Sequence, residues 1–121
     1  GFKWIAADDT AQSIISFRRI DKSGKEVICV CNFVPVTREN YRIGVPRDGR
    51  YKVVLDTDAA EFGGDGILKE RGIRSFKVED EPMHGLDHSI SLTLPALSTL
   101  YLVNEPPRRR SRPLLPEKTD K

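Results

Sequence analysis

Residues 89–103, SISLTLPALSTLYLV, carry the clearest alternation of apolar and polar positions in the chain. In 89–94, isoleucine and leucine alternate with serine and threonine, which is typical of a strand with one buried face. Pro95 interrupts this alternation, and 97–103 forms a second apolar run. Because proline has no N–H to donate to a sheet, it belongs at a strand end or a turn. The pattern predicts two strands that meet at a corner.

Three further stretches, 13–19, 27–33 and 76–78, have the composition of strands. The segment 27–33 is apolar almost throughout, as expected for a central strand that is covered on both faces. The polar turn residues 21–24 predict a hairpin between it and 13–19. No window of helical length repeats apolar residues at three- and four-residue spacing.

A second hairpin is predicted between strands 41–45 and 51–55, because Asp48-Gly49 is a strong signal for a tight turn between strands. The glycine-rich residues 56–74 are expected to form a long connection without regular structure. Short strands at intervals of about 8–12 residues, separated by turns, predict an all-β sandwich or barrel.

The chain has 121 residues, which suits one domain with a single modest core. No apolar stretch approaches the ~20 residues that a membrane span needs, so no membrane partner is expected. The whole chain has a formal net charge of +2. Residues 105–121 contain six basic and three acidic residues, so this segment alone has a net charge of +3. The body, 1–104, therefore carries −1 and has no basic footprint for nucleic acid.

The composition changes abruptly after residue 104, since 105–121 contains four prolines and few apolar residues. Such a segment buries too little surface to offset the entropy of ordering it. We expect a folded domain over 1–104 and a disordered, basic, proline-rich tail over 105–121.

Cys29 and Cys31 are the only cysteines, and they stand two apart in a predicted strand, so both side chains are expected on one face. This spacing is poorly placed for a disulfide, and we predict two reduced thiols in the core and a cytoplasmic location. With His84 and His88 they are the nearest approach to a metal-binding set. One intervening residue is too few for the cysteine pair of a zinc site, so no metal is predicted.

Catalytic residues are not predicted either. Asp87, His88 and Ser89 are the residue types of a hydrolase triad, but three adjacent residues that enter a strand point to opposite faces. The glycines of 63–66 lack the spacing and the following Lys-Ser/Thr of a phosphate-binding loop, so no cofactor is predicted. The aspartates of 56–65 lack the ligand pattern of a known calcium loop.

Trp4 is the only tryptophan and leaves two interpretations open. An exposed aromatic ring can stack on a sugar, so Trp4 is a candidate glycan contact. Alternatively, Phe2 and Trp4 pack against a neighbouring domain.

The order of the motifs GFKWIAADD, CNFVPVTRENYRIGVP, YKVVLDTDAAEFGG and HSISLTLPALSTLYLV resembles the C-terminal β-domain of bacterial 1,4-α-glucan (glycogen) branching enzymes. The resemblance extends from residue 1 to about 105. It implies a Greek-key β-sandwich of about seven or eight strands that follows a catalytic (β/α)8 barrel. By the same resemblance, Phe2, Trp4 and Ile5 correspond to the segment just after that barrel and are expected at the seam between the two domains.

The family cleaves an α-1,4-glucan and attaches the cut segment through an α-1,6 bond, with an aspartate nucleophile and a glutamate acid/base that belong to the barrel. None of those motifs occurs in this sequence, so the resemblance implies an accessory domain that is inactive alone and has the barrel of its parent chain, and also α-glucan, as partners. The alternative is an autonomous glycan-binding module that uses Trp4, Tyr41 or Tyr51.

Overall fold

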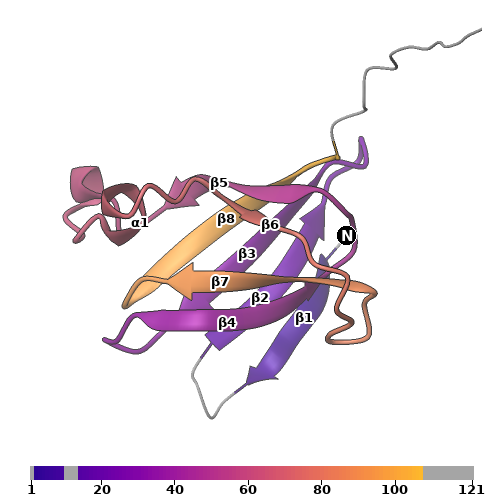
Figure 1. Ribbon diagram of the computed structural model, residues 1–121, viewed down its shortest axis with the longest axis horizontal. Coiled ribbons are helices and arrows are strands. Elements are labelled where there is room, and N and C mark those ends of the chain that lie inside the picture. Colours follow the sequence, from indigo (N-terminus) through magenta and orange to yellow (C-terminus); the bar gives the residue numbers. More distant parts are fainter. Residues whose placement is uncertain (1, 10–13, 108–121) are drawn as a thin grey trace, which may run out of the picture.

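Figure 1 shows the computed structural model, which describes residues 2–9 and 14–107; for 2, 4 and 6–9 it describes the backbone alone. The described part of the chain folds into strands with two short helical turns. The strands are β1 (Phe2–Asp9), β2 (Ile14–Ile20), β3 (Glu26–Asn32), β4 (Arg38–Val45), β5 (Arg50–Asp56), β6 (Ser75–Lys77), β7 (His88–Leu94) and β8 (Ser98–Glu105). The helical turns are η1 (Ala60–Phe62) and α1 (Ile67–Glu70), both between β5 and β6.

The strands form two antiparallel sheets, which confirms the prediction of an all-β sandwich. One sheet has six strands in the order β1-β2-β3-β8-β5-β6, and the other pairs β4 with β7. In Figure 1 the β4–β7 ribbon crosses in front of the larger sheet. Strand β8 lies beside β3 and β5 rather than beside β7, so the chain passes repeatedly from one sheet to the other, as in a Greek key.

The predicted corner at Pro95 is confirmed. Strand β7 ends at Leu94 in the small sheet, and β8 begins at Ser98 in the large sheet. The three residues between them turn the chain, and Leu97 adopts a positive φ of 50°.

The predicted hairpin between 41–45 and 51–55 is wrong. Strands β4 and β5 belong to different sheets, and the turn around Asp48 carries the chain across the sandwich. Gly49 has φ 106°, a conformation that favours glycine. The crossing between the sheets therefore needs glycine at this position, just as a tight hairpin turn would. The dipeptide marks a sharp reversal of direction, but it does not determine which strands pair.

Three other elements, β1, η1 and α1, were not predicted. Strand β1 pairs with β2 at one edge of the large sheet, although FKWIAADD lacks a regular alternation. The register of this pair shifts between Trp4 and Ala6 and again before Asp9, and such irregularities hide a period-two pattern. The turns η1 and α1 interrupt the predicted glycine-rich connection, but each covers at most four residues.

The core lies between the sheets and takes one face of each. From the large sheet it includes residues such as Ile28, Val30, Leu100 and Leu102; from the ribbon it includes Ile43, Val45, Ile90, Leu92 and Leu94. Every one of these side chains is at most 1% exposed. The alternation in 89–94 is therefore explained by one face that packs on the large sheet.

The connections gather at two opposite ends of the sandwich (Figure 1). We call one the polar end; it carries the connections 21–25, 46–49 and 78–87, and β1 begins there. We call the other the apolar end; it carries the connections 33–37, 57–66 and 95–97. In the part of the chain that is described, no helix is long and apolar enough to cross a membrane.

Candidate functional site

Three large apolar side chains are exposed on two connections of the apolar end. They are Phe33 and Val36 on the β3–β4 connection and Leu97 on the β7–β8 corner, with exposed fractions of 57%, 55% and 65%. We call these three residues the apolar tip. Single exposed apolar residues are common, but several on adjoining loops indicate a surface that another molecule or domain covers.

Buried Asn32, at the end of β3, holds the two loops of the tip together. Its side-chain amide donates to the carbonyl oxygens of Val36 at 3.0 Å and Pro95 at 3.1 Å. Its Oδ1 accepts the backbone N–H of Val34 at 3.2 Å. One buried side chain therefore fixes both loops and the direction in which they present their apolar residues.

Leu97 adds a direct bond between these loops, because its N–H donates to the carbonyl oxygen of Val34 at 2.9 Å. Its φ of 50° lies in the left-handed region, which costs a residue with a Cβ about 1–2 kcal/mol. Glycine or asparagine fits such a position with less strain. The sequence instead places there the most exposed of the large apolar side chains that the structure describes.

Phe62 is also exposed at this end, on the connection between β5 and α1. Buried Asp58 braces this connection, because its Oδ1 and Oδ2 accept the N–H groups of Asp65 at 3.1 Å and Ile67 at 3.0 Å. Both oxygens of Asp58 therefore have backbone partners within the loop. Burial raises the pKa of the neighbouring Asp56 carboxyl, although its bond to the Asp58 N–H opposes the shift.

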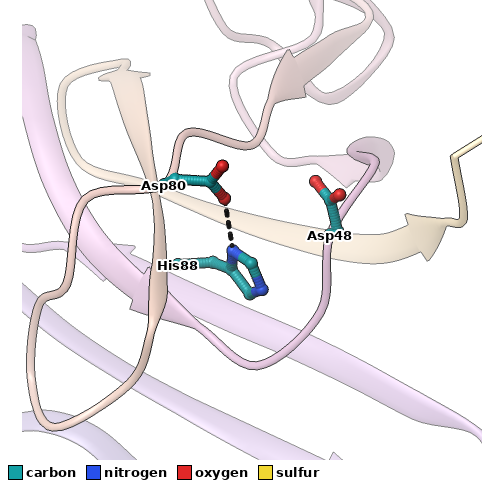
Figure 2. Close-up of side chains that lie close together, drawn as sticks. All are labelled: Asp48, Asp80 and His88. Atoms are coloured by element: carbon teal, nitrogen blue, oxygen red, sulfur yellow. Dashed lines mark hydrogen bonds and ion pairs between the residues drawn. The ribbon is translucent and has the colours of Figure 1, made fainter.

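The polar end brings together Asp48, Asp80 and His88, which Figure 2 shows on three separate segments. His88 Nδ1 lies 3.0 Å from Asp80 Oδ1, and one ligand-type atom of each residue lies within 4.8 Å of the others. Imidazole and carboxylate are donors that divalent transition metals accept. Both carboxylates are exposed, and Asp48 Oδ1 also accepts the N–H of Gly49 at 2.7 Å. Sequence analysis missed this cluster because its members are far apart along the chain and have no ligand spacing.

Both histidines make contacts near the last strands. His88 pairs with Asp80, and His84 Nδ1 accepts the N–H of Gly44 at 3.0 Å. Ser89, the third member of the Asp87-His88-Ser89 run, is buried and accepts a bond from Arg42 at 2.8 Å. His88 and Ser89 thus have separate partners on different segments.

Burial corrects the expectation that Tyr41 and Tyr51 contact a glucan. The side chains are 8% and 1% exposed and belong to the core cluster, so neither presents a ring face to a sugar. The Tyr51 hydroxyl accepts the N–H of Arg47 at 3.2 Å, and burial raises its pKa to about 12. Apolar cores accept tyrosine when the hydroxyl finds such a partner.

Ile5 is the one residue of the expected domain seam whose side chain the structure describes. Its side chain is partly buried and packs against the domain's own core. The other two residues expected at the seam, Phe2 and Trp4, have side chains outside the described part of the structure, as does most of the predicted tail, from residue 108 onward.

Cys29 and Cys31 are free thiols on one face of β3, as predicted. That face is the outer face of the large sheet, however, because the alternate residues of β3 fill the core. Cys29 is buried there beside Tyr101 of β8, and burial raises the pKa of its thiol. Tyr101 is 40% exposed and lines an open groove with Arg19, Asp21 and Lys25.

This antiparallel sandwich, with its two sheets and crossing connections, matches a family of accessory domains. The chain belongs to the family described as alpha amylase, C-terminal all-beta domain, whose family model matches residues 4–105.

Its relatives include three proteins named 1,4-alpha-glucan branching enzyme GlgB. The one from Aquifex aeolicus is 48% identical over 106 residues, and the one from Aromatoleum aromaticum is 44% identical over 105 residues. Each alignment covers 87% of this chain and 16% of the relative. The protein from Paraburkholderia xenovorans is 43% identical over 102 residues, covering 84% of this chain and 14% of the relative. The chain thus spans about a sixth of the length of these relatives.

Proposed function

We propose that this chain is the non-catalytic C-terminal domain of a 1,4-α-glucan branching enzyme and that it supports the catalytic barrel of its parent polypeptide. The observation that carries the proposal is the identity of 43–48% with three branching enzymes over most of the chain. The parent transfers α-1,4-glucan segments to α-1,6 positions during glycogen synthesis.

The arrangement of titratable side chains supports an accessory role. Glycosyl transfer by double displacement needs two carboxyl groups about 5 Å apart across a sugar site, one of them as nucleophile. In the described residues, buried Asp58 has both oxygens bonded to backbone N–H groups, and exposed Asp80 is paired with His88. Asp48 and Asp80 do approach each other within 4.8 Å, but both are exposed and Asp80 is held by His88. In the proposed arrangement the domain contributes packing and rigidity, and the reacting carboxylates belong to the barrel of the parent polypeptide.

The test compares the 121-residue chain with the full-length parent polypeptide on amylose. The full-length polypeptide is expected to introduce branches, measured by the loss of iodine absorbance and by chain lengths after debranching. The chain alone is expected to leave both unchanged. Branching by the chain alone, or no branching by the full-length polypeptide, would contradict the proposal.

We further propose a cytoplasmic location. Cys29 and Cys31 are both free, which is usual where thiols stay reduced.

A glucan contact is a second proposed function, and one exposed aromatic favours it. Tyr101 presents part of its ring on the outer sheet face, and Arg19, Asp21 and Lys25 offer hydrogen bonds around the same groove. Titration of maltoheptaose into the chain, followed by amide chemical shifts, is expected to move residues around Tyr101 and not those around the buried Tyr41. A Trp4→Ala variant tests the remaining predicted aromatic, and an absence of saturable shifts would exclude this function.

A further inference from the structure

We infer that the apolar end of the sandwich, and specifically Phe33, Val36 and Leu97, is the surface on which the preceding part of the parent polypeptide docks. The inference rests on the proposed function, because it requires a parent polypeptide with further domains. It adds the contact surface, which lies far along the sandwich from the start of β1.

The first argument is the contrast between exposure and rigidity at the tip. Exposed apolar side chains on flexible loops can fold back on the domain. Here Asn32 fixes both loops through three hydrogen bonds, and Leu97 is held outward at an unfavourable φ. Strained backbone that persists at a surface is typical of functional contacts.

The second argument concerns area. The three side chains of the tip expose on the order of 300 Å² of apolar surface, and Phe62 adds to it at the same end. A stable complex between separate proteins buries about 800 Å² on each partner, so this surface is small for a free partner or a second copy. Domains of one chain hold each other through interfaces of about 600–1,500 Å² in total, because the tether supplies a high effective concentration. A domain of the same polypeptide therefore fits the area best.

The third argument is the composition around the tip. The exposed carboxylate of Glu39 and the guanidinium of Arg71 form an ion pair at 2.8 Å at the same end. An apolar centre with charged groups at its edge is the usual composition of a protein interface.

The distance to the rest of the polypeptide is compatible with this assignment. Strand β1 begins at the polar end, and a strand of eight residues spans about 25 Å. The relatives have roughly 550 residues outside the aligned segment, which would fold to a radius of gyration of about 24 Å. A body of that size can join the domain at the polar end and still cover the apolar end.

Hydroxyl-radical footprinting of side chains tests the inference directly. The modification rates of Phe33, Phe62 and Leu97 are compared between the 121-residue chain and the full-length polypeptide, with buried Phe76 as the internal control. We expect at least about fivefold slower modification of the two phenylalanines in the full-length polypeptide, since interface cores exclude water. Equal rates in both would overturn the inference.

Two surface substitutions, Phe33→Ser and Leu97→Asn, add a functional readout. In the 121-residue chain neither is expected to lower the melting temperature, because both side chains are exposed. In the full-length polypeptide each is expected to speed proteolytic release of the domain by about tenfold, the effect of losing one apolar anchor. Val54→Ser, at a 52% exposed valine on β5 outside the tip, is the matched control, and a larger effect of Val54→Ser than of both tip variants would overturn the inference.

If another molecule binds the tip instead, the experiments give a different result. A concentration-dependent dimer of the 121-residue chain that Phe33→Ser abolishes would assign the tip to a second copy. Maltoheptaose shifts centred on 33–37 would assign it to glucan; either result overturns the inference. Failure of branching by a full-length polypeptide whose tip is protected would instead contradict the proposed function alone.

Discussion

The two ends of this sandwich are built from connections of similar length, yet they differ in what they present to solvent. At the polar end, side chains satisfy one another: Asp80 pairs with His88, and Arg42 pairs with Glu79 and Glu81. The apolar end uses the buried amide of Asn32 for internal bonding and exposes Phe33, Val36 and Leu97. In the described residues, the polar end pairs charged side chains with one another, whereas the apolar end leaves large apolar side chains exposed.

The two ends also differ in the interactions that stabilise them. Exposed ion pairs contribute little, about 0–1 kcal/mol each, so the polar end depends mainly on backbone geometry. The apolar end depends on one buried hydrogen-bond network, and its strain is compensated by the rest of the fold. Substitutions at the two ends should therefore act through different mechanisms.

The largest effect is expected from Gly44→Ala, near the polar end of β4. A Cβ at this position would overlap the carbonyl oxygen of Met83, and the backbone of the β6–β7 connection would have to move. The shift would also disturb the bond from the Gly44 N–H to His84. We expect a loss of about 3 kcal/mol or more in the free energy of unfolding, measured by urea denaturation.

Gly24→Ala is the matched control for this prediction. A Cβ on Gly24 meets no atom within 4 Å, but its φ is 87°. It should cost only the strain of that conformation, about 1–2 kcal/mol. Equal losses for the two variants would show that overlap with Met83 has no special role.

Asn32→Ala tests the apolar end and should rank second. The substitution removes the partner of the Val36 carbonyl oxygen and of the Val34 N–H, whereas the Pro95 carbonyl oxygen keeps its bond from the Ser98 hydroxyl at 2.7 Å. We expect a loss of about 2–3 kcal/mol, since unpaired buried polar groups keep their desolvation cost. Amide exchange in 33–37 and 95–97 should rise more than in the polar-end connections. A uniform change across both ends would refute the role of Asn32 as a local clamp.

Sequence alone predicted much of the fold. Its failures concern which strands pair and in what register. The corner at Pro95 was predictable because a missing N–H and a change of period are local properties. The partner of β4 was not, because Asp48-Gly49 makes the chain reverse its direction whether the next strand joins the same sheet or the other one. Strand β1 was not predicted, because its irregular pairing with β2 leaves no regular alternation of apolar and polar residues in its sequence.

The candidate surface was less predictable than the fold. Phe33 and Leu97 have the same hydrophobicity as core residues, and only their position on connections separates them from the core. Tyr41 and Tyr51 show the converse, since aromatic rings suggested as sugar contacts fill the core. The family resemblance, by contrast, was readable from the motifs, and the matches to residues 4–105 confirm it.

Leu97→Asn should have a small effect of the opposite sign to those above. Asparagine tolerates positive φ, so the variant relieves strain at the corner without removing buried area. We expect the free energy of unfolding of the 121-residue chain to rise by about 0.5–1 kcal/mol. Leu97→Ala removes the side chain but keeps the strain, and should leave stability nearly unchanged. Destabilisation by both variants would mean that Leu97 packs within its own domain.

The two ends also shift the pKa of a carboxyl group in opposite directions. The resulting change in stability with pH is the smallest effect that we predict. At the polar end, bonds from Ser23 and Lys25 lower the pKa of the exposed Asp21 carboxyl. At the apolar end, burial raises the pKa of Asp56.

A lowered folded-state pKa gives stability that is present above the unfolded value, 3.8, and is lost as the pH falls through the folded value. Asp21→Asn should therefore destabilise the chain at neutral pH and matter progressively less below pH 3.8. Asp56 has the reverse sign: its ionisation opposes folding, and the penalty grows as the pH rises from 3.8 through the raised folded value. Asp56→Asn should consequently gain stability, relative to the native sequence, across that window. Carboxyl carbon NMR titrations should place the two midpoints on opposite sides of 3.8, and midpoints on the same side would remove this electrostatic contrast between the ends.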